Sequence, residues 1–434
     1  MIQPRIFKGA RDFLPEQMLH RERILEIMRK TFKKYGYAPV ETPAIEYLDI
    51  LTGKYGEEAD RLIYKLNYKT GTKDEAALHY DLTVPFSRMV AMNNDLPIPF
   101  KRYQMQPVWR ADRPQPHQGR FREFYQCDVD CVGAESMLIE AELIAITYEV
   151  LSALNIPNFL IKINSRKILN GITQYVGLDD AFVGDVCTSI DKLDKMPWNE
   201  VAKELSSKNI PTDSIEKLHA LFSNEMSLAQ LKITLNDIEI AQKGIQEIEE
   251  IFNYLEILEI ENKNYTFDIS LARGLDYYTG PIFETKLPDY PHIGSLNGGG
   301  RYNGLIASFG GKDLPAVGTS LGLDRIFTAM QQLQLLEPLK TSTKVLVGNF
   351  GANTLEASLK LVSALRKQNI NTEFYPEENK LKKQFSYCDK KNIPFMCIIG
   401  EEEIEKQVVT LKNMQKSEQH QLTLQDLISF LQNH

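Results

Sequence analysis

The stretch RADRPQPHQGRFREFYQCDVD, residues 110–130, gathers four arginines in its first part and two aspartates at its end. The prolines and the glycine between its second and third arginines predict a turn. Residues 120–130 are therefore expected to return as a strand beside residues 101–110. Because alternate side chains of a strand share a face, one face would carry Arg120, Arg122, Phe124, Gln126, Asp128 and Asp130.

This face would present guanidinium groups near the turn and carboxylates farther along the strand. Arginine forks suit phosphate groups, and the ring of Phe124 offers a surface on which a base can stack. Phe124 and Asp130 would lie roughly 20 Å apart at about 3.3 Å per residue, enough for a ligand with an anionic and a cationic end. The alternative is a solvated charged hairpin, in which the arginines pair with Asp112, Glu123 and Asp128.

Composition places the chain among ordinary globular proteins. Its 434 residues are 43% hydrophobic and 25% charged, and this length suggests about three domains. The five cysteines have no C-x-x-C spacing, so neither a zinc site nor a disulfide framework is predicted. The N-terminus lacks the pattern of a signal peptide, and no apolar run reaches membrane-spanning length. We expect a cytoplasmic protein without a membrane segment.

The net charge of −8 argues against a protein that binds nucleic acid over a broad surface. Any contact with nucleic acid would depend on local basic patches. A plain nucleic-acid-binding module without catalysis is therefore a poor alternative, although the lysines at 390 and 391 could serve it.

Periodicity divides the chain into a main body, an insertion and a tail. Helices are predicted at 15–35 and 134–154, and strands at 62–68, 76–83 and 101–110. Residues 165–255 have a helical pattern throughout and are interpreted as an inserted helical module, and strand patterns return from 265 to 330. From residue 343 strands and helices alternate, which indicates a small α/β domain. The predicted domains are 1–164 with 256–330, the insertion 165–255, a linker 331–342, and 343–434.

Two further stretches could carry chemistry. In LARGLDYYTGPIFE, residues 271–284, Arg273 stands among small and apolar residues and needs an anionic partner, which is either a ligand or Asp276. Tyr277 and Tyr278 follow it as hydroxyl donors or an aromatic wall. GSLNGGGRYNGL, residues 294–305, allows backbone to approach a ligand closely or is simply a turn. It matches neither the phosphate loop nor the dinucleotide motif.

Strand ends supply the remaining candidates. VGTSLGLDRI, residues 317–326, predicts a strand that leads into a helix, with Arg325 facing away from the apolar residues; an ordinary exposed arginine is the alternative. LHYDLTVPF, residues 78–86, places Asp81 and Thr83 on one face at the end of a strand.

In their order along the chain, these pieces resemble the histidyl-tRNA synthetases, which are class II aminoacyl-tRNA synthetases, over essentially the full length. GARDFLPEQ and GYAPVETPAIE resemble the first class II motif, with Pro43 at the dimer interface. VWRADRP with GRFREFYQCDVD resembles the second motif, and GTSLGLDRI the third. LARGLDYYTGPIFE and GGGRYNGL are similar to stretches peculiar to the histidine enzymes, and the tail resembles their anticodon-binding domain.

The resemblance implies an α+β fold, with an antiparallel catalytic sheet, helices and a helical insertion, followed by the small α/β anticodon-binding domain. It also implies a homodimer that uses ATP with Mg²⁺ to form histidyl-adenylate and then transfers the histidyl group to tRNA(His). The alternative within this fold is the histidine-sensing regulatory subunit of ATP phosphoribosyltransferase. Such paralogues lack the tail domain and degrade the arginine stretch, both of which this chain keeps.

By the same resemblance, Arg110 and Arg273 would be the catalytic residues. Arg110 would bind the α-phosphate and Arg325 the γ-phosphate of ATP, with Phe124 stacked on adenine. The residues implied for ATP are Arg110, Asp112, Arg120, Phe124 and Arg325. Those implied for histidine are Asp81, Leu82, Thr83, Arg110, Gln126, Asp130, Arg273, Tyr277 and Tyr278. Asp81 and Asp130 stand where many bacterial members have glutamate, and no residue is assigned to Mg²⁺.

Overall fold

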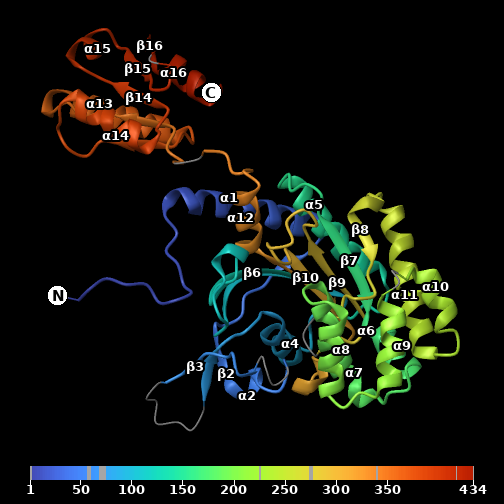
Figure 1. Ribbon diagram of the computed structural model, residues 1–434. Helices are drawn as coiled ribbons and strands as arrows, with labels where there is room; N and C mark the ends of the chain where they lie inside the picture. Colours follow the sequence, from blue (N-terminus) through green and yellow to red (C-terminus); the bar gives the residue numbers. More distant parts are fainter. Residues whose placement is uncertain are drawn as a thin grey trace. The chain divides into compact units, whose positions relative to one another are not determined.

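The computed structural model describes residues 2–55, 60–67, 75–223, 226–272, 277–338, 341–416 and 418–433 (Figure 1). The chain forms two compact units, Met1–Asp12 with Arg23–Leu335, and Phe13–Glu22 with Leu336–His434. Each unit has its own sheet and its own buried core. Within the described ranges, no helix combines the length and the apolar character needed to cross a membrane.

The first unit is built on an eight-stranded sheet in the order β1-β5-β6-β11-β10-β9-β7-β8. Neighbouring strands run antiparallel, except that β1 is parallel to β5 and β7 to β8. The strands are β1 (Ala38–Pro39), β5 (Phe100–Trp109), β6 (Glu123–Val132), β7 (Leu160–Ser165), β8 (Tyr265–Phe267), β9 (Pro281–Lys286), β10 (Asn297–Arg301) and β11 (Ala316–Gly322). The predicted α+β class with an antiparallel sheet is confirmed, and β5 and β6 form the predicted hairpin.

One predicted strand is wrong in its second half. The expected strand 76–83 ends at Leu78, where β4 (Ala76–Leu78) pairs with β2 (Ile45–Tyr47) and β3 (Lys65–Leu66) in a small sheet. Helix α4 (Thr83–Met92) then begins at Thr83. The Asp81 carboxylate accepts the Val84 N–H at 3.1 Å, so it satisfies a free donor of the first turn, where Pro85 is also tolerated.

The predicted long helices occur with small shifts at their ends. Helix 15–35 is α1 (Pro15–Lys34), followed by Gly36 with a φ of +81°, a conformation that favours glycine after a helix. Helix 134–154 is α5 (Leu138–Ala153). The short α2 (Leu48–Leu51) was not predicted, and α12 (Leu323–Gln332) follows β11 as the third motif suggested.

The described residues between 166 and 257 are mainly helical, as the sequence pattern indicated. The helices are α6 (Arg166–Tyr175), α7 (Val183–Ile190), α8 (Trp198–Ser207), α9 (Thr212–Phe222), α10 (Leu228–Thr234) and α11 (Glu239–Ile257). They gather at one side of the first unit, beyond β7 and β8 (Figure 1). They pack through apolar stripes, and Ile245, Ile248 and Ile251 of α11 are fully buried.

The second unit contains a five-stranded sheet in the order β13-β12-β14-β15-β16, with the first three strands parallel. Its strands are β12 (Val345–Val347), β13 (Thr372–Phe374), β14 (Phe395–Ile398), β15 (Val409–Asn413) and β16 (Gln419–Leu422), and its helices are α13 (Ala352–Lys367), α14 (Leu381–Lys391), α15 (Glu401–Glu405) and α16 (Leu424–Asn433). The predicted alternation of strands and helices is confirmed. The prediction did not include α15, β16 and α16.

A buried ion pair joins the main sheet to helix α5. The Arg301 guanidinium reaches both oxygens of Glu140, at 2.6 Å from Nε and 2.8 Å from Nη2. Its Nη1 donates to the Ala134 carbonyl at 3.0 Å. Both side chains are almost fully buried, so the loss of either partner leaves a charge in the interior without its counterion.

We therefore expect Glu140→Gln to lower the free energy of unfolding of the first unit by about 3–5 kcal/mol. The double variant Glu140→Leu with Arg301→Met, which removes both charges, should lose much less. Urea unfolding followed by tryptophan fluorescence measures this unit, because both tryptophans of the chain, Trp109 and Trp198, lie in it. Equal losses in the single and double variants would show that the pairing is not the cause.

Candidate active site

The floor of the candidate site is formed by β6, β11, β10 and β9. Along β6, the residues Phe124, Gln126, Asp128 and Asp130 share one face, as the sequence predicted. The strand register aligns this face with both neighbours, in the rows Arg102–Asp130–Gly318, Gln104–Asp128–Ser320 and Gln106–Gln126–Gly322. Two rows contain a glycine, and a Cβ added at Gly318 would collide with the Asp130 carboxylate. Glycine at 318 therefore makes room for that carboxylate.

A cavity of about 320 Å³ lies over this floor, within the range of sites for small molecules. Most residues predicted from the sequence line it, namely Asp81, Thr83, Arg110, Phe124, Gln126, Asp130, Tyr277, Tyr278 and Arg325. Asp112 and Arg120 line a smaller cavity that shares Arg110, Phe124 and Arg325 with the first. The two cavities together bring the predicted arginines and carboxylates into one region.

Two predicted residues that the structure describes, Leu82 and Arg122, line neither cavity. Arg273 lies outside the described residues. The Leu82 side chain is fully buried, so a contact of Leu82 with a ligand would have to come from its backbone. Arg122 was expected on the face of the ligand, but its guanidinium donates to the carbonyls of Asp112 and Lys8, at 3.0 and 3.3 Å. It therefore stabilises the turn and the N-terminal segment.

Arg110 is anchored to the backbone of the neighbouring chain segment. Its Nε donates to the Tyr80 carbonyl at 3.0 Å, and its guanidinium lies 4.2 Å from the Tyr80 ring and 5.2 Å from the Phe124 ring. This bond to the backbone orients the Arg110 guanidinium, which lines the cavity. Arg120 pairs with Asp112 at 2.9 Å and is 44% exposed, so this pair can rearrange at little cost.

Asp81 follows Tyr80, whose carbonyl anchors Arg110, and lies between two tyrosines. Its oxygens accept from the hydroxyls of Tyr55 at 3.0 Å and Tyr277 at 3.2 Å. Burial raises the pKa of this carboxyl above its usual value, although the Val84 N–H and Arg110 act in the opposite direction. The turn between β4 and α4 thus places Asp81 beside Tyr277.

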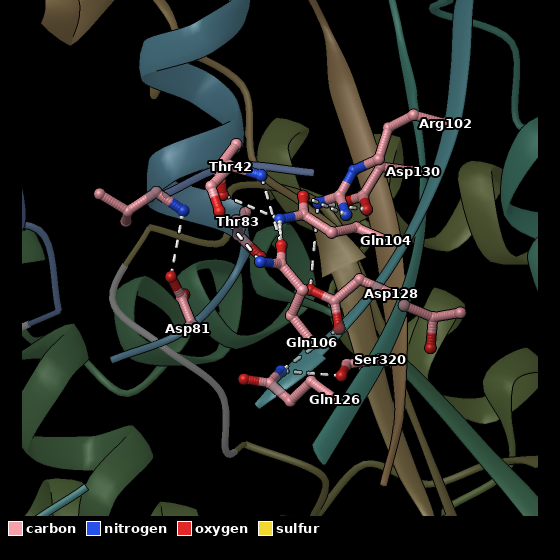
Figure 2. A network of polar contacts seen from close by, with 12 residues as sticks. Thr42, Asp81, Thr83, Arg102, Gln104, Gln106, Gln126, Asp128, Asp130 and Ser320 are labelled. Carbon is pink, nitrogen blue, oxygen red and sulfur yellow. Dashed lines mark hydrogen bonds and ion pairs between the residues drawn. The ribbon is translucent and has the colours of Figure 1, made fainter. Parts of the chain in front are cut away.

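A buried cation, Arg102 of β5, lies beside Asp130 on the same face of the sheet. Arg102 is fully buried and its Nη2 lies 2.8 Å from Asp130 Oδ2 and 4.0 Å from Asp128 Oδ2. The Tyr302 hydroxyl donates to the other oxygen of Asp130 at 2.7 Å. Figure 2 shows that Arg102, Asp130 and Asp128 continue into a chain of amides. In it, Gln104 accepts from Arg102 at 3.2 Å and donates to Thr42 Oγ1 at 2.8 Å.

Asp128 accepts from the Ser320 hydroxyl as well as from an amide. It is 2% exposed and lines the cavity, and it accepts from Gln126 at 3.3 Å. Burial raises its pKa from 3.8 to about 7, opposed by Arg102 and reinforced by the neighbouring charge of Asp130. Two carboxyls this close titrate as a pair. Asp128 therefore gains from a positively charged ligand.

The sequence did not single out Asp128, Arg102 or Tyr302 as site residues. Asp128 was on the predicted face, two residues before Asp130, so its spacing was a usable signal. Arg102 and Tyr302 come from other strands or loops, and their approach to Asp130 depends on the register of the sheet. For the glycine-rich stretch 294–305, the sequence left open a simple turn or a segment that approaches a ligand. In the structure, Asn297–Arg301 form strand β10 of the main sheet and not a turn.

The third predicted motif sits at the junction of β6 and α12. Asp324 accepts the Tyr125 N–H at 2.7 Å and pairs with Arg11. This bond ties the start of α12 to β6 and so places Arg325 at the rim of both cavities. Among the described residues, no cluster of three or more histidine, cysteine, aspartate or glutamate side chains is arranged to hold a metal ion.

Known proteins resemble this chain over its full length. A family model described as histidyl-tRNA synthetase matches residues 9–326, and one described as an anticodon binding domain matches residues 344–434. Histidine–tRNA ligases of Cytophaga hutchinsonii and Bacteroides fragilis are 43% and 44% identical to it, and each comparison covers 99% of both sequences. The crystal structure of histidyl-tRNA synthetase from Nostoc sp. PCC 7120 has a TM-score of 0.88 at 32% identity, covering 100% of both chains.

The raised pKa of Asp128 has a consequence for stability. Between 3.8 and about 7 the folded chain holds a proton that the unfolded chain releases, so this contribution to stability is present at low pH and is lost as the pH rises through that window. We expect Asp128→Asn to raise the free energy of unfolding at pH 8 by on the order of 1–3 kcal/mol. The gain should shrink toward pH 5.

Urea unfolding of both proteins at several pH values tests this expectation. Glu142→Gln is a matched control, because Glu142 also pairs with a cation, Lys101 at 2.7 Å, but does not belong to the residues that line the cavity. A gain in the Asp128 variant that increases as the pH falls would contradict the expectation.

Proposed function

This chain belongs to the histidyl-tRNA synthetases and joins histidine to tRNA, and from that premise we propose how its cavity divides between the two small substrates. The observation that carries the proposal is the charge of the cavity lining, which combines the arginines Arg110 and Arg325 with the carboxylates Asp81 and Asp130. The same family membership disfavours the regulatory-subunit alternative, since the chain covers catalytic relatives from end to end and includes the anticodon-binding domain.

ATP lies beside the arginines in this proposal. Phe124 stacks on the adenine, Arg110 contacts the α-phosphate and Arg325 the γ-phosphate. Asp112 and Arg120, which line the adjoining cavity, stand beside the nucleotide. Arg110 is suited to its role because the Tyr80 carbonyl orients the guanidinium, and a preorganised cation stabilises charge that develops during reaction.

Histidine lies beside the carboxylates. Asp81, Thr83 and Gln126 hold the α-ammonium side of the substrate, and Asp130, Tyr277 and Tyr278 surround its ring. Leu82 contributes through its backbone, and Arg273 contacts the substrate carboxylate. One oxygen of that carboxylate attacks the α-phosphorus, and pyrophosphate leaves. The protein supplies position and charge for this step and no nucleophile of its own.

Mg²⁺ fits the cavity by the chemistry of its oxygen donors. This ion commonly takes one or two protein carboxylates and the phosphates of the substrate, and keeps several waters. Glu284 of β9 lines the cavity together with Arg325, and we propose that Glu284 holds the ion. When bound, Mg²⁺ offsets the negative charge of the phosphates.

The domain division remains as predicted from the sequence. We propose residues 1–164 with 256–330 as the catalytic domain, 165–255 as the helical insertion, 331–342 as the linker and 343–434 as the anticodon-binding domain; the family matches to 9–326 and 344–434 support a boundary between the last two. The anticodon-binding domain contacts tRNA(His). We place this reaction in the cytoplasm, where protein synthesis needs charged tRNA.

A homodimer is supported by an apolar groove on the first unit. It is lined by Pro43, Ile45, Tyr47, Ile50, Leu66, Ala76, Met92 and Phe309, beside the ion pair Arg88–Glu46. Ile45, Tyr47 and Met92 are 56%, 58% and 71% exposed, an unusual grouping of large apolar side chains on a surface. Pro43 belongs to the segment that resembles the first class II motif, so we propose that a second copy of the chain covers this groove.

Exchange of labelled pyrophosphate into ATP tests the function. We expect exchange with L-histidine and none with the other nineteen amino acids. Arg110→Ala should lower the rate about 10²–10³-fold, as is typical when one preorganised donor is lost. Arg29→Ala, which changes an exposed arginine paired with Glu26 on α1, serves as the control. No histidine-dependent exchange in the unmodified chain would refute the function.

Sedimentation of the full chain tests the dimer. We expect the mass of two chains at micromolar concentration. Met92→Glu should shift the mass toward one chain, because it buries a charge in an apolar interface. Ile257→Glu, at an equally apolar and 67% exposed position of α11, should leave the mass unchanged. A dimer that tolerates Met92→Glu would place the interface elsewhere.

A further inference from the structure

The N-terminal residues 7–11 lie against the turn between β5 and β6, which carries arginines of the site. The Gly9 carbonyl accepts the Arg122 N–H at 2.9 Å, and the Lys8 carbonyl accepts from the Arg122 guanidinium at 3.3 Å. These bonds fix the backbone two and three residues before Arg11. The position of Arg11 is therefore set by the same turn that shapes the site.

The Arg11 side chain joins this turn to the start of α12. Its guanidinium lies 3.1 Å from the centroid of the Phe121 ring, an arrangement in which the face of the ring attracts the cation. Its Nη2 pairs with the Asp324 carboxylate, which is 2% exposed, whereas Arg11 is 24% exposed. Arg11 thus provides the buried carboxylate with a cation from the solvent side.

Asp324 lines the smaller cavity, next to the arginine to which the proposed function assigns the γ-phosphate of ATP. The other oxygen of Asp324 accepts the Tyr125 N–H at 2.7 Å, and Arg325 follows it in the chain. The turn packs directly on this part of α12, because a Cβ added at Gly119 would lie 2.9 Å from the Arg325 Cα. A negative charge therefore stands close to the place proposed for the phosphates.

A buried carboxylate near bound phosphates repels them unless a cation offsets its charge. Among the described residues, Asp112 and Asp324 are the carboxylates that line the smaller cavity. Asp112 pairs with Arg120, which also lines this cavity. Asp324 pairs with Arg11, which does not belong to the lining. Arg11 can therefore offset a charge of the cavity wall without occupying space that a ligand needs.

We propose that Arg11 is a positioning residue for ATP, which acts through Asp324: it offsets the charge of this carboxylate, so that the triphosphate can lie beside Arg325. This inference rests on the proposed function and gives the N-terminal segment a part in nucleotide binding. The sequence did not single out Arg11, because 313 positions separate it from Asp324.

The number of phosphates on the nucleotide distinguishes this role from a purely structural one. An effect that acts through charge increases with the charge of the ligand. A displaced turn would instead weaken every nucleotide whose base stacks on Phe124. We therefore expect ATP to depend on Arg11 much more than AMP does.

Calorimetric titration of the full chain with ATP and with AMP measures this difference. In Arg11→Ala, the Kd for ATP should rise roughly 10- to 100-fold, and the Kd for AMP should rise much less. An unchanged Kd for ATP, or equal losses for ATP and AMP, would overturn the inference and leave the proposed function intact. If the unmodified chain bound no ATP, the proposed function itself would fail.

Two changes at Asp324 separate charge from packing. The double variant Arg11→Ala with Asp324→Asn should recover most of the lost ATP affinity, because no charge is left to offset. Asp324→Asn alone keeps an oxygen that can accept the Tyr125 N–H, and it should bind ATP no more weakly than the unmodified chain. A double variant that binds ATP as weakly as Arg11→Ala would show that Arg11 acts through packing alone, against the proposal.

Arg21→Ala is the matched control. Arg21 also places its guanidinium over a phenylalanine ring, that of Phe13 at 3.9 Å, and is 6% exposed, but it lines neither cavity. Its loss should leave both nucleotide affinities unchanged. Arg11→Lys keeps the charge and should keep most of the ATP affinity. If tryptophan fluorescence shows that Arg11→Ala does not fold, Arg11→Lys and Asp324→Asn decide, and a large loss of ATP affinity in either would overturn the inference.

Discussion

The burial of three carboxylates along one wall and floor is the constraint on which this site depends. A carboxylate removed from water is costly unless hydrogen bonds or a counterion replace the lost hydration. Asp81 receives two tyrosine hydroxyls and a backbone N–H, and Asp130 receives Tyr302 and Arg102. Asp128 receives Gln126 and Ser320, with Arg102 at 4.0 Å. The burial of these carboxylates therefore lowers the stability of the free protein. A cationic ligand that pairs with them offsets part of this cost.

The arginines around the cavity are less buried than its carboxylates. Arg110 is anchored by one backbone carbonyl, and Arg120 and Arg325 remain partly exposed. Water stabilises these charges in the free protein, and a bound polyanion takes the place of that water. The arginines and the carboxylates are connected through β6, whose single face carries the aromatic ring, the amide and the carboxylates in order. The rigid strand thus sets the separation between the nucleotide and the amino acid, which is the main contribution a protein can make to a transfer between two bound substrates.

Much of the architecture could be predicted because it follows from local patterns in the sequence. The proline and glycine turn after Arg110 predicted the hairpin, the period of two along residues 120–130 predicted its ligand face, and the tail showed an alternation of strands and helices. The extended prediction for residues 76–83 failed in its second half because α4 begins at Thr83, where the Asp81 carboxylate accepts the Val84 N–H. Arg122 was assigned to the wrong surface because it precedes the first residue of β6, where the alternation begins.

The sequence by itself determined the order of the motifs, the two sheets and the residue types of a site with cationic and anionic groups, since these depend on neighbours within a few positions. Only the tertiary structure decided that Arg102 lies beside Asp130, that the Tyr302 hydroxyl donates to it and that Gly318 leaves it room. These contacts join β5, β6, β11 and the loop after β10. Sheet register governs them, and a shift of a single residue would turn each of these side chains to the other face.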